Sequence, residues 1–302
     1  MSKVTLQNCP ICSSSQLAPL FSGIDYSHTK EEFEVEKCAD CGFVFTQNAP
    51  DENNIGKYYE SEDYVSHSDT QKGLFFKIYH AVRNYMLGQK RKMIEQVTDK
   101  GKLLDIGCGT GYFLNEMQVQ KWEVTGIEQD EQARKYGSNK FNINVKTPAE
   151  LFELESGSFT AISMWHVLEH VHNLDGYLKQ IYNLLESDGT LAIAVPNHDS
   201  HDGKHYGKHW AAWDLPIHLW HFTPDSMEKL MKKHGFKIIA HKRLPFDSFY
   251  VSMLSEKYKK GTGVVGQLSG IAIGLISFVK SLSHPKKCSS VVYLIKKQSA
   301  ST

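Results

Sequence analysis

The residues that could do chemistry begin with a glycine-rich turn at residues 105–111. The stretch reads Asp-Ile-Gly-Cys-Gly-Thr-Gly and follows a short apolar run that suits a buried strand. Glycine lets the backbone turn sharply and lets a ligand approach it, because no Cβ is in the way. Residues 124–127 read as the next strand, and Glu128 at its carboxyl end can accept hydrogen bonds from ribose hydroxyls. With a helix starting at Tyr112, this arrangement indicates a site for a nucleotide-sized ligand.

The glycine spacing separates two families of nucleotide-binding protein. A dinucleotide fingerprint, Gly-x-Gly-x-x-Gly, would need glycine at 112, where Tyr112 stands. The Asp-x-Gly-x-Gly-x-Gly pattern instead resembles the first motif of class I S-adenosylmethionine-dependent methyltransferases. This resemblance implies that the turn carries the amino-acid part of S-adenosylmethionine and that an acidic residue holds the ribose. The implied cofactor-binding residues are Asp105, Gly107, Gly109, Gly111 and Glu128, with Ala149 near the adenine and Trp165 near the transferring methyl.

The fold class follows from the order of apolar segments. Strands are expected at 143–145, 159–165, 190–195, 236–240 and 290–295, separated by helical patterns. The order resembles the methyltransferase family over about residues 100–240. It implies an α/β fold, with a Rossmann-like seven-stranded methyltransferase sheet whose last strand is antiparallel, preceded by a small zinc ribbon. We expect a ribbon at 1–50, a helical lead-in or lid at 51–98, and a methyltransferase domain at 99–302 with a helical insertion at about 247–288.

Four of the six cysteines form two tight pairs. Cys9 and Cys12, and Cys38 and Cys41, form a Cys-x2-Cys repeat in which each short turn aims two thiolates at one point. Two such turns can close a tetrahedron around Zn²⁺, and iron or disulfides are the weaker alternatives. Four ligands leave no open position, so we expect a structural zinc that stabilises a small domain. Residues 33–36 of the connecting segment alternate like a strand.

Histidines supply the candidate catalytic groups. His166, Glu169 and His170 follow the fourth strand, and if a helix begins there they share one face. His218 and His221 lie in a loop, 214–224, that resembles the substrate-side loop of a methyltransferase subfamily, with Ile217 where that subfamily usually has a basic residue. The candidates are thus His166, His170, His218 and His221, as general bases on an acceptor hydroxyl or as ligands of a divalent metal together with Glu169. We prefer the simpler interpretation that Glu169 and His170 brace the loop.

Two further segments have alternative interpretations. The tyrosine-rich stretch at 57–66 and the helical pattern from about 70 to 97 could form a lid that uses Tyr58, Tyr59, Tyr64 and His67, but we expect packing over the sheet. Residues 264–282 form an apolar helical pattern with glycines at 266, 270 and 274. We expect its apolar face to pack in the core; a lid, a dimer contact or a helix on a membrane surface are the alternatives.

Bulk composition limits the choice of partners. Lys plus Arg and Asp plus Glu both number 34, so no strong field favours nucleic acid. No long apolar core follows Met1, and the paired cysteines suit a reducing compartment, so we expect a cytoplasmic protein. The sequence predicts a methyltransferase that acts on a small-molecule acceptor by in-line methyl transfer, with S-adenosylmethionine and structural zinc as cofactors. The alternative is a non-catalytic S-adenosylmethionine-binding protein that docks a macromolecule through its ribbon.

Overall fold

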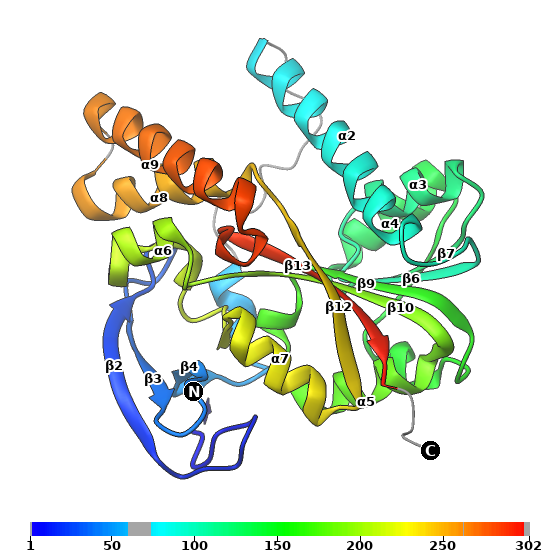
Figure 1. Ribbon diagram of the computed structural model, residues 1–302, viewed down its shortest axis with the longest axis horizontal. Helices are drawn as coiled ribbons and strands as arrows, with labels where there is room; N and C mark the ends of the chain where they lie inside the picture. The colour runs from blue at the N-terminus through cyan, green and yellow to red at the C-terminus, as the bar shows by residue number, and fades with distance from the viewer. Residues whose placement is uncertain (1, 60–73, 262, 299–302) are drawn as a thin grey trace.

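A mixed seven-stranded sheet forms the centre of the protein (Figure 1). The computed structural model describes residues 2–59, 74–261 and 263–298. The sheet has the order β12-β13-β10-β9-β6-β7-β8, and β13 runs antiparallel to both of its neighbours. Its strands are β6 (Lys102–Ile106), β7 (Glu123–Ile127), β8 (Asn144–Lys146), β9 (Phe159–Trp165), β10 (Leu185–Pro196), β12 (Phe236–Arg243) and β13 (Ser290–Lys297). The expected seven-stranded sheet with an antiparallel last strand is confirmed.

Helices connect the parallel strands and cover the sheet. They are α3 (Tyr112–Val119), α4 (Glu131–Phe141), η2 (Ala149–Glu153), α5 (Leu174–Leu184) and α7 (Pro224–Lys233). Because both faces of the sheet are covered, its inner strands are mostly apolar, and Leu103 and Leu104 are fully buried. Thr223 closes a capping box at the start of α7, where Pro224 occupies the first turn. The right-handed connections leave the carboxyl ends of β6, β7 and β9 at one edge, where the glycine turn lies.

The N-terminal segment forms a second, antiparallel sheet that is joined to the rest of the protein. Its order is β11-β4-β3-β2, from β2 (Leu17–Ile24), β3 (Glu32–Cys38), β4 (Val44–Gln47) and β11 (Trp220–His221). The small pair β1 (Lys3–Val4) and β5 (Ala49–Pro50) and the 3-10 helix η1 (Ile55–Tyr59) complete this region. Strand β11 belongs to the loop at 214–224 that carries His218 and His221, called here the histidine loop. The ribbon and the histidine loop therefore share backbone hydrogen bonds.

The segment after Trp165 differs from the sequence prediction. The structure has only a 3-10 turn, η3 (Leu168–His170), and the next helix begins at Leu174 with Asn173 as its cap. His166 has a positive φ of 59°, and its N–H donates to Ala194 O in the neighbouring strand. A left-handed residue that still belongs to the sheet cannot start a right-handed helix. The prediction of one helix face that presents His166, Glu169 and His170 is therefore wrong.

The long helix α2 (Leu74–Glu95) lies across one side of the sheet edge, where Figure 1 shows it beside α3. Its residue Ile94 is fully buried, and Arg91 pairs with Glu116 of α3 at 2.9 Å. The predicted lid residues Tyr64 and His67 lie outside the described residues. The helix thus packs near the glycine turn.

The insertion between β12 and β13 is a helical hairpin. It consists of α8 (Asp247–Lys260), α9 (Val264–Ser283) and the short η6 (Pro285–Lys287), and it packs on α6 (His201–Tyr206), η4 (Gly207–His209) and η5 (Ala211–Trp213). In Figure 1 the hairpin stands at the edge of the molecule, on the side away from β7. Helix α9 buries its small residues, including Gly266, Gly270 and Gly274, and exposes its large apolar ones. The expectation that its apolar face packs in the core is wrong, because close helix contact uses the glycines.

Candidate functional site

Glu128 ties the glycine turn to the neighbouring strand. Its Oε2 accepts a hydrogen bond from the Gly109 N–H at 2.7 Å, and its Oε1 accepts from the Asp130 N–H at 2.9 Å. The Gly107 and Cys108 N–H groups both donate to Ile127 O, one residue before Glu128. The carboxylate therefore lies where the turn after β6 meets the end of β7, as the sequence predicts.

The three glycines of the turn all need the left-handed backbone region. Their φ angles are 71° at Gly107, 53° at Gly109 and 80° at Gly111. A Cβ on Gly107 would lie 2.3 Å from a methyl of Val167, so this glycine permits close packing. A Cβ on Gly109 would meet no heavy atom within 4 Å. The turn is thus packed on one side and open at Gly109, and this open side fits a bound cofactor.

A buried carboxyl, Asp105, lies beneath the turn. It is 2% exposed and accepts a hydrogen bond from Ser163 at 2.6 Å. Burial raises the pKa of Asp105 to about 7, although Ser163 and the charge of Lys90 oppose this shift. Asp105 thus titrates near neutral pH beneath the cofactor turn.

Trp165, at the end of β9, is packed between two helices. Its ring is 5.3 Å from that of Phe113, and the Lys90 ammonium of α2 lies 4.6 Å from its centroid. Burial lowers the pKa of Lys90. Lys90 was not identified from the sequence as a neighbour of Trp165. The one hint in the sequence was a lysine beside the apolar face of the helix expected at about 70–97. Ala149, at the start of η2, is exposed.

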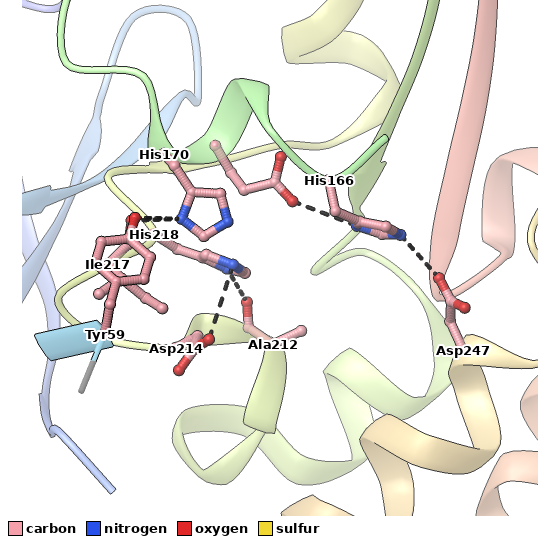
Figure 2. Close-up of polar contacts among 9 residues, drawn as sticks. Tyr59, His166, His170, Ala212, Asp214, Ile217, His218 and Asp247 are labelled. Atoms are coloured by element: carbon pink, nitrogen blue, oxygen red, sulfur yellow. Dashed lines mark hydrogen bonds and ion pairs between the residues drawn. The ribbon is translucent and has the colours of Figure 1, made fainter. Parts of the chain in front are cut away.

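His166 is held between two carboxylates from distant parts of the chain (Figure 2). Its Nε2 is 3.0 Å from Asp247 Oδ2, and its Nδ1 is 3.3 Å from Glu169 Oε1. Burial lowers the pKa of His166, but the hydrogen bonds and charges of Asp247 and Glu169 outweigh this effect and raise the pKa to about 9. At neutral pH His166 is therefore a paired imidazolium rather than a free base. Asp247 was not among the predicted residues, because it lies 81 positions away, in the insertion.

His170 and His218 form a second pair, with their ring centroids 4.6 Å apart (Figure 2). His170 Nδ1 lies 3.1 Å from Ile217 O, and His218 Nδ1 lies 2.9 Å from Ala212 O. A carbonyl only accepts, so each Nδ1 carries the proton and each Nε2 keeps its lone pair. Burial and the neighbouring His218 lower the pKa of His170 to about 4, and burial lowers that of His218. Both imidazoles are therefore neutral at pH 7 with an unprotonated Nε2, and the Nε2 of His218 lies 4.0 Å from Asp214 Oδ2 (Figure 2).

Glu169 joins this pair from the same 3-10 turn. It is fully buried, and its Oε2 has no hydrogen-bond partner among the described residues. One carboxylate oxygen of Glu169 and one ring nitrogen each of His170 and His218 all lie within 4.8 Å of one another. The loop is braced as the simpler interpretation expects, because Leu219 N–H donates to Glu169 O and Tyr59 OH lies 3.1 Å from His170 Nδ1. The hydrogen bonds nevertheless leave Glu169 Oε2 without a partner among the described residues and the Nε2 atoms of His170 and His218 unprotonated.

His221 occupies a different environment from the other candidates. It is 4% exposed in β11, and its Nε2 lies 2.9 Å from Thr46 Oγ1 of the ribbon sheet. Burial lowers its pKa well below the usual range. The structure thus brings His166, His170 and His218 to one region. His221 instead contacts the ribbon sheet.

The four cysteines of the N-terminal repeat converge. Cys9 Sγ is 3.4 Å from Cys41 Sγ, Cys12 Sγ is 3.5 Å from Cys38 Sγ, and the four sulfurs lie within 4.8 Å of one another. Four thiols at this spacing fit a tetrahedral metal better than two disulfides, whose sulfurs would be in bonding contact. Helix α7 supports the cluster, because Lys229 donates to Cys41 O and Lys233 donates to Pro10 O.

An open hollow lies at the opposite edge of the sheet. It is lined by Gly101, Lys102, Glu123 and Thr160, at the amino ends of β6, β7 and β9. The glycine turn and the histidines lie at the carboxyl ends, where open α/β sheets bind their ligands. We therefore assign no role to this hollow.

Comparisons with known proteins agree with this geometry. Residues 79–241, more than half of the chain, match the methyltransferase domain family. The chain belongs to this family, the S-adenosylmethionine-dependent methyltransferases, and has the class I fold.

Curated relatives share only part of their length with this chain. A ubiquinone biosynthesis O-methyltransferase of Pelagibacter ubique is 31% identical over 101 residues, which are 32% of this chain and 42% of the relative. The protein of that name from Rickettsia bellii is 26% identical over 149 residues, 46% of this chain and 61% of the relative. The chain thus spans about half the length of these relatives. A SAM-dependent methyltransferase from Archaeoglobus fulgidus has a similar fold, with a TM-score of 0.50, 18% identity, and coverage of 75% of this chain and 100% of that chain.

Proposed function

We propose that the protein transfers a methyl group from S-adenosylmethionine to a small-molecule acceptor. The observation that carries this proposal is the carboxylate of Glu128 tied to the open side of the glycine turn at Gly109. Asp105, Gly107, Gly109, Gly111, Glu128, Ala149 and Trp165 would hold the cofactor. The family membership and fold support an enzyme over an idle binding module.

The chain's contribution to the reaction is positioning and proton transfer. Bound S-adenosylmethionine supplies a methyl group already activated by a positively charged sulfur, so the protein need not generate an electrophile. The packed turn and Trp165 orient one reactant, and the histidine loop orients the other, which favours an in-line approach. His170 and His218 are each neutral, with the ring proton on Nδ1 and none on Nε2. The Nε2 of one of them would take the proton of an acceptor hydroxyl.

A hydroxyl is the acceptor group that the observations favour. The two neutral imidazoles suit removal of a proton from oxygen, and the curated relatives from Pelagibacter ubique and Rickettsia bellii are named as O-methyltransferases. His166 plays another part, because its pairing with Asp247 and Glu169 makes it a fixed cation that positions both carboxylates. We assign it to positioning.

Calorimetric titration with S-adenosylmethionine and with its demethylated product tests the cofactor site. We expect one site per chain for both compounds in the zinc-loaded protein. A folded protein that binds neither compound would overturn the proposal. Binding of both without labelled-methyl transfer to any hydroxylated, amine or carbon acceptor in a broad panel would favour the non-catalytic alternative.

We also propose that the N-terminal cluster of Cys9, Cys12, Cys38 and Cys41 binds one structural Zn²⁺. Four thiolates close the coordination shell, so this ion supports the fold and has no open position for chemistry. Elemental analysis of the purified protein tests this, and the expected result is about one zinc per chain.

A divalent metal at Glu169, His170 and His218 is a second candidate for this site. The specific observation is that one carboxylate oxygen of Glu169 and one ring nitrogen each of His170 and His218 lie within 4.8 Å of one another. Each Nδ1 donates to a carbonyl, as metal-bound histidines do. Two imidazoles and a carboxylate suit Zn²⁺, Fe²⁺ or Mn²⁺ better than Mg²⁺. Ligands of one such ion lie about 3.4 Å apart, and the three candidate ligand atoms lie within 4.8 Å of one another before any ion binds.

Cobalt substitution separates this site from the cysteine cluster. Co²⁺ bound by thiolates gives intense sulfur-to-metal charge-transfer absorption, whereas Co²⁺ bound by imidazole and carboxylate does not. We expect a second Co²⁺ without that absorption, and we expect its loss in His218→Ala. His172→Gln is the matched control, because His172 Nε2 donates to Pro50 O outside the cluster. A wild-type protein that takes up Co²⁺ only at the cysteines would leave His170 and His218 as acid–base groups.

A further inference from the structure

Helix α9 exposes a continuous apolar face. Its eight large apolar side chains on this face are between 42% and 79% exposed: Val264, Val265, Leu268, Ile271, Leu275, Ile276, Val279 and Leu282. Within the part of the chain that the structure describes, α9 is the helix that is long and apolar enough to cross a membrane by length and composition. Large exposed apolar patches of this kind mark interaction surfaces.

The opposite face of α9 is fixed, so the apolar face cannot turn inward. A Cβ on Gly270 would lie 2.7 Å from Met253 Cα, and one on Gly274 would lie 2.8 Å from Phe249 Cα. Ser277 donates to Asp202 at 2.6 Å, which pins the same face to α6. Only residues without a bulky side chain fit against α8 there. The hairpin therefore holds its apolar face outward.

Lysines flank the apolar face at both of its ends. Residues 246–288 contain six lysines, 257, 259 and 260 before α9 and 280, 286 and 287 at or after its end, although the whole chain has no formal net charge. The two carboxylates of this segment are engaged or buried, because Asp247 pairs with His166 and Glu256 is 1% exposed. Lys257, Lys259, Lys280 and Lys286 are exposed, and Lys287 is exposed but paired with Asp199 at 2.5 Å. The hairpin is thus a local cationic and apolar surface on a neutral protein.

We propose that this face binds the surface of an anionic lipid bilayer, with α9 lying in the plane of the interface. A helix with an apolar face and lysines beside it is the pattern that inserts shallowly among lipid headgroups. A membrane-spanning arrangement would require α9 to leave α8, because its glycine face is packed and β13 returns to the central sheet. Long lysine side chains reach the headgroups while the apolar side chains enter the acyl boundary.

The charge of the hairpin argues against a second copy of the chain as the occupant. A two-fold dimer places the same surface of each protomer face to face. Both apolar faces would then bring their lysine clusters together, with no exposed carboxylate of the described hairpin to compensate them. An anionic surface complements these charges instead.

The hairpin that carries the apolar face is joined to the histidine site through α8. Asp247, the first residue of α8, holds His166, and the preceding Phe246 contacts Tyr85 of α2 with ring centroids 6.3 Å apart. Phe246 and Tyr85 are 39% and 56% exposed. The same hairpin thus contributes both the proposed lipid-binding face and a residue of the histidine site. The inference does not depend on the methyltransferase activity, because it concerns binding alone.

Co-sedimentation of the zinc-loaded full chain with vesicles tests the proposal. We expect partition onto vesicles of phosphatidylcholine and phosphatidylglycerol in equal parts, with weaker binding to phosphatidylcholine alone and weaker binding at high salt. Leu268→Glu with Leu275→Glu should lower partition at least about tenfold. Val119→Glu is the matched control, because Val119 is 66% exposed on α3 and should leave partition unchanged.

A charge variant separates the two parts of the surface. Lys259→Gln with Lys286→Gln should lower partition about fivefold for each lysine, with circular dichroism and zinc content unchanged. No binding to the anionic vesicles, or equal binding by the Leu268→Glu/Leu275→Glu variant, would overturn the proposal. A wild-type dimer that the same variant converts to monomer, without vesicle binding, would assign the face to a second copy.

Discussion

Asp247 Oδ2 lies 3.0 Å from His166 Nε2, and this contact joins the first residue of the helical insertion to the residue that follows β9. The insertion is thereby part of the site, because Asp247 helps to keep His166, the residue after β9, positively charged. Glu169 contacts the other nitrogen of the same ring. The variants below test this pairing and the cofactor and cysteine sites.

The His166–Asp247 pair should make stability fall at alkaline pH. The folded-state pKa of His166 is about 9, above the unfolded value of 6.5. The stabilisation is therefore complete below about pH 6.5 and is lost as pH rises through about 9. Its size should be about 1 to 2 kcal/mol, since the ring is one-third exposed and solvent weakens the pair. Urea unfolding between pH 6 and 10 measures it.

Asp247→Asn should flatten this pH dependence, because the amide cannot hold the imidazolium. Asp225→Asn, an exposed carboxylate on α7, is the control and should keep the wild-type profile. An unchanged alkaline loss of stability in Asp247→Asn would show that the pair does not set the pKa of His166.

Gly107→Ala and Gly109→Ala should have different effects. Alanine at Gly107 adds a methyl 2.3 Å from Val167 in a left-handed conformation, so we expect about 3 kcal/mol of destabilisation. Alanine at Gly109 meets open space and should cost about 1 kcal/mol, for its backbone conformation alone. Its methyl would enter the open side of the turn and should weaken S-adenosylmethionine binding at least about tenfold. Denaturant titration measures the loss of stability, and calorimetry measures the affinity for S-adenosylmethionine. If Gly109→Ala binds S-adenosylmethionine as tightly as the wild type, the cofactor does not contact the turn at Gly109.

Glu128→Ala should weaken S-adenosylmethionine binding by about tenfold or more. The change removes the carboxylate proposed for the ribose and also frees the Gly109 N–H. Glu123→Ala is the matched control, because Glu123 is at the other end of β7 and its side chain is 72% exposed. If calorimetry gives both variants the wild-type affinity, Glu128 has no part in holding the ribose.

Cys9→Ser with Cys38→Ser should remove about one zinc per chain and lower the thermal midpoint. The thiolates are the proposed ligands, and the ribbon shares a sheet with β11, so its loss should loosen the histidine loop as well. Cys288→Ser is the control for a buried thiol outside the cluster. Elemental analysis showing zinc retained in the double variant would contradict the ribbon assignment.

Local patterns in the sequence determined the main architecture. The sequence predicts the glycine turn from three local features: the apolar run before Gly107, the glycine spacing, and Glu128 after the next strand. These features could be read from the sequence because each one is defined by residues close together along the chain. The same holds for the cysteine pairs, whose spacing fixes a turn, and for α7, whose Thr223 and Pro224 mark its start. The alternation of strands and helices indicated an α/β fold, and the family resemblance implied its seven-stranded sheet with an antiparallel last strand.

Only the tertiary structure decided which distant residues meet. His218 reaches His170, and Asp247 reaches His166, across 48 and 81 residues, which no local period encodes. The backbone of His166 is left-handed because it completes a hydrogen bond to Ala194, and this removed the predicted helix. Periodicity showed that α9 is amphipathic, but the space against Met253 and Phe249 decided that its glycines face inward. Side-chain volume at a contact between two helices is a property of both partners, and one helix's sequence specifies only half of it.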